Sequence, residues 1–152
     1  CLSPGSRPGV SPRSVRSLPL TVSVSPMPGP RVLVVEDDPD LRDVLCRVLA
    51  TEPYDPVPAR DGDEALDMLV FRPAPAVVVL DLRLPGELNG WDLLQWMRRD
   101  PELREIPVVI VSGAPLERVE LTLEHSPTAC LMKPVDPAAL IAHLRSACAP
   151  PW

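Results

Sequence analysis

Short runs of aliphatic residues alternate with segments of helical periodicity over residues 31–148. Four such runs are each followed at once by a polar residue: Val32–Val35 by Glu36, Ala76–Leu80 by Asp81, Val108–Val111 by Ser112, and Thr128–Met132 by Lys133. A short continuous aliphatic run is typical of a strand that is buried on both faces of a parallel sheet. The pattern therefore predicts four buried strands with polar side chains at their carboxyl ends.

Apolar positions with helical spacing fill the intervals between these runs. They predict four helices, with apolar sides at Leu41, Val44, Leu45, Val48 and Leu49; at Ala65, Leu66, Leu69 and Val70; at Leu93, Trp96 and Met97, beside a second stripe of Trp91, Leu94, Gln95 and Arg98; and at Leu140, Ile141 and Leu144. Asp38 before Pro39 and Asp136 before Pro137 are expected to cap the first and last helices. A side-chain oxygen followed by proline is a common helix start.

A weaker strand is expected over residues 54–59, where Pro53, Pro56 and Pro58 interrupt the pattern. Proline is confined largely to sheet edges, because it cannot donate a hydrogen bond to a neighbouring strand. Strands that alternate with helices predict an α/β fold, a doubly wound five-stranded parallel sheet with helices on both faces. In a flavodoxin-like strand order of 2-1-3-4-5 the second strand lies at an edge, which fits its prolines.

The polar residues at the strand ends form the candidate site. Ligands of a doubly wound sheet bind beyond the carboxyl ends of the strands, where the strand order reverses. Glu36, Asp37 and Asp81 are expected to meet there, and crowded carboxylates favour a hard divalent cation, Mg²⁺ or Mn²⁺. The hydroxyl of Ser112 and the ammonium of Lys133 would complete a pocket for phosphoryl oxygens. This set predicts phosphoryl transfer to Asp81.

Lys133 is the only lysine of the chain, and the other fourteen strong bases are arginines. An ammonium group is a compact charge that can reach one phosphoryl oxygen, whereas a guanidinium is a broad planar fork. This favours a chemical role, and a lysine codon that persists by chance in a GC-rich gene is the alternative. The other site residues also have structural interpretations: a solvated helix cap for Glu36–Asp38, and turn positions for Asp81 and Ser112.

Composition separates an N-terminal leader from one acidic domain. Residues 1–30 hold seven prolines and three arginines among serines and glycines, without a carboxylate, and are expected to be disordered. Residues 31–148 form the predicted domain, and residues 149–152 a short tail. The leader carries +3 of a net charge of −6, which leaves about −9 for the remainder and argues against direct nucleic-acid binding. Met27 is the expected native start, with a flexible linker as the alternative.

Membrane attachment, zinc binding and disulfides are all disfavoured by the sequence. No stretch has the continuous apolar core of a secretory signal or the length of a membrane span, so we expect a cytoplasmic protein that does not bind membranes. The four cysteines include no C-x-x-C pair and no neighbouring histidine ligands. Cys46 and Cys130 lie within apolar patterns and are expected to be core thiols rather than ligands.

Residues 31 to about 147 resemble the receiver domains of response regulators. Four stretches carry the resemblance, in order and at the family's spacing: Val-Leu-Val-Val-Glu-Asp-Asp-Pro-Asp-Leu-Arg, Ala-Arg-Asp-Gly-Asp-Glu-Ala-Leu, Val-Val-Leu-Asp-Leu-Arg-Leu-Pro-Gly and Leu-Met-Lys-Pro. The resemblance implies a signalling module rather than a conventional enzyme. It implies these roles: Asp81 as phosphoacceptor; Glu36, Asp37, Asp81 and the Arg83 backbone carbonyl as metal ligands; Ser112 as switch hydroxyl; Lys133 as phosphoryl partner; and a cis bond from Lys133 to Pro134.

Two departures from the family pattern concern the switch and the rim of the site. The loop Pro85–Gly90 is one residue longer than is common, which predicts a reshaped rim beside the metal. Cys130 stands where the family usually has an aromatic switch residue, so no aromatic ring can couple Ser112 to the output surface from that position. Arg83, two residues after the acceptor, would contact the phosphoryl group or point to solvent.

The expected partners are a sensor histidine kinase or phosphotransfer protein and an unknown downstream protein. Phosphorylation would shift the surface formed by the fourth and fifth strand–helix units, through which a homodimer could form. The chain is expected to be a stand-alone receiver or part of a longer kinase or regulator. One alternative is a receiver-like interaction module that is never phosphorylated. A phosphatase of the haloacid dehalogenase type is disfavoured, because Arg83 occupies the place of its acid/base aspartate.

Overall fold

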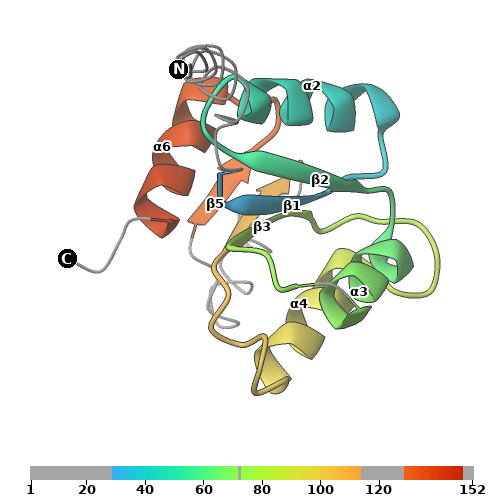
Figure 1. Cartoon of the computed structure of the whole chain (residues 1–152). Coiled ribbons are helices and arrows are strands. Elements are labelled where there is room, and N and C mark those ends of the chain that lie inside the picture. Colours follow the sequence, from blue (N-terminus) through green and yellow to red (C-terminus); the bar gives the residue numbers. More distant parts are fainter. Residues whose placement is uncertain (1–28, 72, 114–128, 149–152) are drawn as a thin grey trace, which may run out of the picture.

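The computed structural model describes residues 29–71, 73–113 and 129–148. Within the described residues, strands and helices alternate along the chain from β1 to β4 (Figure 1). The elements are β1 (Arg31–Val35), α2 (Pro39–Ala50), β2 (Asp55–Ala59), α3 (Gly62–Phe71), β3 (Val77–Asp81), α4 (Gly90–Arg99), β4 (Val108–Ser112), β5 (Ala129–Met132) and α6 (Pro137–Ala147). The predicted leader up to residue 28, the tail 149–152 and residues 114–128 of the fourth strand–helix unit lie outside the described residues and remain predictions.

The five strands form one parallel sheet in the order β2-β1-β3-β4-β5, which confirms the predicted topology. The proline-rich strand β2 lies at one edge, as its sequence indicated, and β5 lies at the other. Every residue of the central strands β3 and β4 is buried. The short, continuous aliphatic runs are therefore those of strands covered on both faces.

Alternate residues of the strands point to opposite faces and build two separate aliphatic cores. On one face Val34, Val79 and Val109 pack with the buried sides of α2 and α6. On the other face Leu80 and Ile110 pack with α3 and α4. Figure 1 shows the same division, with α2 and α6 on one side of the sheet and α3 and α4 on the other. The period-two alternation of a strand thus supplies both layers of the doubly wound fold.

Three helical positions differ from the predicted apolar faces. Val44 and Val70 are each 51% exposed, whereas Leu94, assigned to the second stripe, is fully buried. In α4 the buried positions are Gly90, Leu93, Leu94 and Met97, which follow the spacing i, i+3, i+4 and i+7. The centre of a buried face depends on which side of the helix meets the sheet, and local periodicity leaves this open.

Both predicted helix caps are present. The Asp38 carboxylate accepts hydrogen bonds from the backbone N–H groups of Asp40 (2.9 Å) and Leu41 (3.4 Å), with Pro39 in the first turn. Asp136 accepts one from the N–H of Ala138 at 3.2 Å. Each cap satisfies N–H groups that have no partner within the helix, which places the first residue of α2 directly after the acidic end of β1.

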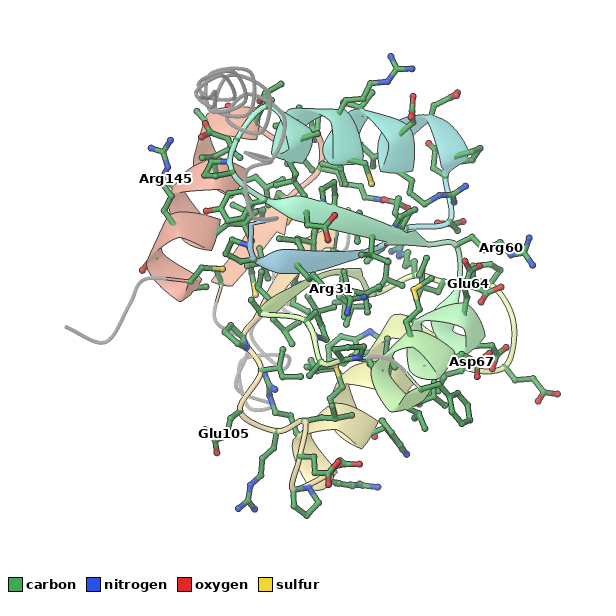
Figure 2. The ribbon with its side chains drawn as sticks, in the orientation of Figure 1. Arg31, Arg60, Glu64, Asp67, Glu105 and Arg145 are labelled. Carbon is green, nitrogen blue, oxygen red and sulfur yellow. The ribbon has the colours of Figure 1, made fainter. Side chains whose placement is uncertain are left out.

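Charged side chains lie on the outside of the helices (Figure 2). Arg60 contacts Glu64 at 3.2 Å beside α3, and Arg145 on α6 contacts Glu52 at 3.1 Å. Exposed ion pairs of this kind contribute between about 0 and 1 kcal/mol. The stability of the fold therefore comes mainly from the two aliphatic cores.

The described cysteines are free thiols at the margins of the two cores. Cys46, Cys130 and Cys148 are all partly buried rather than enclosed. Cys46 packs beside the core under α2 and α6, and Cys130 beside the core under α3 and α4. Burial raises the pKa of each thiol. In the part of the chain that the structure describes, no helix is long and apolar enough to span a membrane.

Gly90 is expected to be a position where even a methyl group is not tolerated. A Cβ at Gly90 would lie 2.2 Å from the backbone oxygen of Asp81 and 2.5 Å from the Cα of Leu82. Gly90→Ala should therefore lower the free energy of unfolding by about 1–3 kcal/mol, because α4 or the end of β3 must shift. Urea unfolding measures this change. Gly113→Ala is the matched control, since a Cβ there would meet nothing within 4 Å; equal stability of the two variants would contradict the prediction.

Candidate functional site

The acidic residues meet because β1 and β3 are neighbours in register. Val35 pairs with Leu80, so Glu36, which follows β1, lies beside Asp81, the last residue of β3. The backbone N–H of Glu36 still donates to the carbonyl of Ala59 at 3.0 Å, so the chain leaves the sheet only after Glu36. The structure thereby brings together two carboxylates that are 45 positions apart in the sequence.

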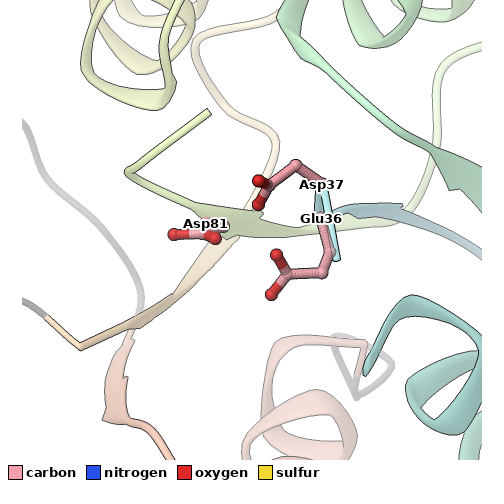
Figure 3. Close-up of side chains that lie close together, drawn as sticks. All are labelled: Glu36, Asp37 and Asp81. Carbon is pink, nitrogen blue, oxygen red and sulfur yellow. The ribbon is translucent and has the colours of Figure 1, made fainter. Parts of the chain in front are cut away.

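Glu36, Asp37 and Asp81 form an acidic cluster. One carboxylate oxygen from each lies within 4.8 Å of the others. In Figure 3 the carboxyl groups of Glu36 and Asp37 both point toward Asp81. Glu36 and Asp81 are only 1% and 3% exposed, whereas Asp37 is exposed. Like charges at this separation repel, and burial removes the water that would screen them.

Lys133 joins the two buried carboxylates. Its Nζ lies 2.7 Å from Glu36 Oε1 and 3.0 Å from Asp81 Oδ2. The backbone N–H of Lys133 donates to the carbonyl of Ser112 at 3.0 Å, which carries the pairing of β4 and β5 one residue beyond Met132. The bond from Lys133 to Pro134 is cis, as predicted. The ammonium therefore reaches the acidic cluster from the far edge of the sheet.

The pKa values of Glu36 and Lys133 reflect this crowding. Burial, with smaller contributions from Asp81 and Asp37, raises the pKa of Glu36 from 4.5 to about 7, although Lys133 opposes the rise. Burial alone would lower the pKa of Lys133, but its contacts with Glu36 and Asp81 outweigh burial and raise that pKa. One ammonium thus compensates the two buried carboxylates incompletely.

The donor set fits a divalent cation. Glu36 Oε1 is buried and accepts no well-directed hydrogen bond within the described residues, so its 2.7 Å contact with Lys133 is an ion pair. Asp81 Oδ1 accepts from the backbone N–H of Arg83 at 2.9 Å, and Asp81 Oδ2 faces Lys133. The three carboxylates offer the hard oxygen ligands that Mg²⁺ and Mn²⁺ prefer. Asp37 is exposed, Glu36 is buried with an unsatisfied oxygen, and Asp81 lies at the end of β3.

Ser112 lies at the carboxyl end of the sheet, whereas Cys130 lies two residues before the end of β5. Ser112 is the last residue of β4, is fully buried and pairs in register with Met132. Cys130 pairs with Ile110 and packs against the core under α3 and α4. The side chain of Arg83 is exposed. The structure thus places every predicted site residue except Cys130 at the carboxyl edge, and Cys130 lies opposite the middle of β4, while their roles remain predictions.

The loop after β3, for which the sequence predicts a reshaped rim, packs on the start of α3. Gly86 adopts a φ of 91°, a conformation that favours glycine. Gly62 lies against the backbone of Leu88, where a Cβ would meet the Leu88 oxygen at 2.1 Å. The side chain of Asn89 caps α4 by accepting from the N–H of Asp92 at 3.0 Å. The rim of the site is therefore held by close backbone contacts.

Sequence reasoning did not single out Arg42, which contacts the acidic loop. Its Nη1 donates to the backbone oxygen of Glu36 at 2.8 Å and lies 3.4 Å from that of Asp37. The available signal was its position in the first turns of the helix, four residues after the Asp38 cap. A side chain there can fold back over the loop that precedes the helix.

Residues 32–145 match the model of the response regulator receiver domain family. Over 118 residues the chain is 35% identical to the phosphate regulon transcriptional regulatory protein PhoB of Escherichia coli, which covers 76% of this chain and 50% of PhoB. It is 33% identical over 121 residues to the two-component response regulator ORR3 of Oryza sativa subsp. japonica, which covers 78% of this chain and 91% of ORR3. The chain thus spans about half the length of PhoB.

A solved receiver-domain structure has the same fold as this chain. The signal receiver domain of a signal transduction histidine kinase from Syntrophus aciditrophicus superposes with a TM-score of 0.73 at 27% identity. The match covers 80% of this chain and 91% of that domain. The acidic cluster of Glu36, Asp37 and Asp81 is typical of phosphoacceptor sites in such domains.

Proposed function

This chain belongs to the response regulator receiver family, and we propose that it acts in two-component signalling as a phosphoacceptor, with Asp81 as the residue that is phosphorylated. The observation that carries the proposal is the placement of Asp81 in an acidic cluster that a lysine contacts. Asp81 Oδ2 lies 3.0 Å from Lys133 Nζ, and the cluster with Glu36 and Asp37 is held within 4.8 Å. Family membership makes the chain a signalling module rather than a conventional enzyme.

In the proposed reaction an oxygen of the Asp81 carboxylate attacks the phosphorus of a phosphohistidine. The new bond joins that oxygen to phosphorus and gives an acyl phosphate. The bond from phosphorus to the imidazole nitrogen breaks, and its electron pair stays with the imidazole. Little covalent chemistry is left for the protein, so its contribution is to position charges around the transferred group.

The residues around Asp81 have distinct roles in this proposal. Glu36, Asp37, Asp81 and the Arg83 backbone carbonyl would bind Mg²⁺ or Mn²⁺, which supplies positive charge beside the phosphoryl oxygens when bound. Lys133 would exchange its contact with Asp81 Oδ2 for one with a phosphoryl oxygen, while the backbone N–H of Arg83 keeps its hold on Asp81 Oδ1. Ser112 would donate its hydroxyl to another phosphoryl oxygen. Each role uses a donor or charge that lies at the same edge of the sheet.

The proposed partners follow from the family. Receiver domains pair with histidine kinases. We propose that a sensor histidine kinase or a phosphotransfer protein supplies the phosphoryl group to this chain. The downstream partner, and a homodimer, would use the surface of the fourth and fifth strand–helix units, of which β4, β5 and α6 are described and residues 114–128 are not. The proposed receiver domain spans residues 31–148.

A second candidate is a receiver-like module that binds its partner without phosphorylation. Two features favour it: Cys130 stands where an aromatic switch residue is usual, and the loop from Pro85 to Gly90 is long. Metal dependence separates the two functions. A docking module should bind its partner equally well in the presence of a chelator, whereas a phosphoacceptor should lose its response.

We expect the wild-type chain to gain the mass of one phosphoryl group when it is incubated with Mg²⁺ and a small-molecule phosphodonor. The gain should disappear when EDTA replaces Mg²⁺, because three clustered carboxylates repel both each other and an incoming phosphoryl group. Intact-mass spectrometry measures it directly. A chain that binds Mg²⁺ but gains no mass would contradict the phosphoacceptor function for this class of donor and favour the docking module.

A further inference from the structure

We propose that Arg42 is a positioning residue, which holds the acidic loop Glu36–Asp38 in the shape that binds a divalent cation. The inference rests on the proposed function, because it concerns the same metal site. It adds a residue that is not one of the proposed ligands and that contacts the loop through its backbone oxygens. Arg42 approaches the loop from α2, whereas Lys133 approaches it from β5.

The contacts of Arg42 are directed at the backbone of the two acidic residues. Its Nη1 donates to the carbonyl oxygen of Glu36 at 2.8 Å and lies 3.4 Å from that of Asp37. These are the two hydrogen bonds that the structure gives to this guanidinium within the described residues. The neighbouring Asp43 pairs instead with Arg47 at 3.0 Å, so that carboxylate does not compete for Arg42.

Arg42 is itself fixed by the start of α2. Its backbone N–H donates to the carbonyl of Asp38 at 2.9 Å, the first hydrogen bond of the helix, while the Asp38 side chain caps the same turn. A guanidinium that starts from this anchored turn can reach back along the loop. Arg42 therefore ties both ends of the loop to one rigid element.

Orientation of the loop carbonyls determines where the carboxylates point. The carbonyl of Glu36 belongs to the peptide plane that joins Glu36 to Asp37, and peptide planes are rigid. A rotation about the Cα–C bond of Glu36 turns this plane, moves the Cα of Asp37 with it and carries the carboxylate away from Asp81. A metal site binds tightly only when all its ligands are held in position at the same time. Residues that are not ligands hold them there through hydrogen bonds.

Charge repulsion makes such a restraint necessary. Without a cation, the carboxylates of Glu36, Asp37 and Asp81 lie within 4.8 Å of one another and favour an open loop. Lys133 compensates the two buried carboxylates, but Asp37 is exposed at the outer end of the cluster. The hydrogen bonds from Arg42 oppose the opening on the side of the loop that Lys133 does not reach.

The test compares direct binding of Mn²⁺ alone, measured by the electron paramagnetic resonance signal of the free ion without a phosphodonor. The variants are Arg42→Gln, which removes the charge, and Arg42→Lys, which keeps the charge on a side chain one bond shorter than the one that brings Nη1 to the loop. Arg47→Gln is the matched control, because it removes the same charge from the same helix at an exposed position. We expect each Arg42 variant to bind Mn²⁺ about tenfold more weakly than wild type, and Arg47→Gln to bind like wild type.

The possible results separate positioning from simple charge attraction. Wild-type affinity in Arg42→Lys, together with weak binding in Arg42→Gln, would show that the charge alone matters and would overturn the proposal. Wild-type affinity in both variants would also overturn it. No Mn²⁺ binding by the wild type itself would instead overturn the proposed function, and this inference with it.

A second measurement keeps the proposal testable if Arg42→Gln folds poorly. Amide hydrogen exchange in EDTA reports on the loop without any metal, and the N–H of Asp38, which donates to Glu36 Oε2 at 3.3 Å, is the probe. Faster exchange at Asp38 in Arg42→Lys, with unchanged exchange in β3 and β4, supports a restraint on the loop. Unchanged exchange at Asp38 would contradict it.

Discussion

Asp81→Asn is expected to abolish the Mg²⁺-dependent gain of phosphoryl mass completely, while the protein stays folded. An amide is not a nucleophile toward phosphorus, so no acyl phosphate can form at this position. The asparagine oxygen can still accept from the backbone N–H of Arg83, as Asp81 Oδ1 does at 2.9 Å. Removing one of three clustered carboxylates also relieves repulsion. Thermal stability in EDTA should therefore equal or exceed that of wild type.

Intact mass and thermal unfolding measured on the same samples test this prediction. Asp67→Asn is the matched control, because it makes the same change of charge outside the acidic cluster. Asp67 is an exposed residue of α3. The control should gain phosphoryl mass like wild type. Full phosphorylation of Asp81→Asn would show that another residue is the acceptor, and an unfolded variant would show that Asp81 is needed for the fold.

Lys133→Met is expected to destabilise the metal-free protein more than any other single change considered for this site. Lys133 Nζ contacts two buried carboxylates, at 2.7 Å on Glu36 and 3.0 Å on Asp81. Removing one partner of a buried ion pair leaves uncompensated charge and typically costs about 3–5 kcal/mol. The lysine side chain is still 28% exposed, so we expect about 3 kcal/mol at pH 8, near the low end of that range.

The destabilisation should depend on pH through Glu36. Its pKa in the folded protein is raised to about 7, chiefly by burial, above the ordinary value of 4.5. Protonation of Glu36 therefore favours the folded state: this contribution is complete below pH 4.5 and is lost as the pH rises through about 7. In Lys133→Met the contact that lowers this pKa is gone, so the loss extends to higher pH. Stability of the variant should fall more steeply than that of wild type between pH 5 and pH 8.

Urea unfolding in EDTA at pH 5, 6, 7 and 8 measures both effects. Arg145→Met is the control, since it removes a cation from an exposed pair with Glu52 and should cost less than about 1 kcal/mol at every pH. Adding Mg²⁺ should restore part of the stability of Lys133→Met. A variant that matches the control at pH 8 would mean that water, rather than Lys133, compensates the two carboxylates.

Much of the fold could be predicted because its determinants are local. The aliphatic run from Val32 to Val35 can be identified as a buried strand without knowing its neighbours, and Pro56 and Pro58 mark an edge strand by lacking N–H groups. Helix caps at Asp38 and Asp136 depend on two or three consecutive residues. Burial of Leu94 and exposure of Val44 could not be predicted in this way, because they depend on how each helix is rotated against the sheet.

Some features of the candidate site could likewise be predicted from the sequence, and others could not. The sequence by itself determined which groups collect at the carboxyl edge, Glu36, Asp37, Asp81, Ser112 and Lys133, because parallel strands all end there. Only the tertiary structure decided that Lys133 bridges Glu36 and Asp81, that Arg42 reaches the loop carbonyls, and that Gly90 packs on the Asp81 backbone. The physical reason is the distance along the sequence over which each interaction acts. Periodicity and caps act over a few residues, whereas these contacts join segments through strand register and side-chain reach, which exist only once the sheet has formed.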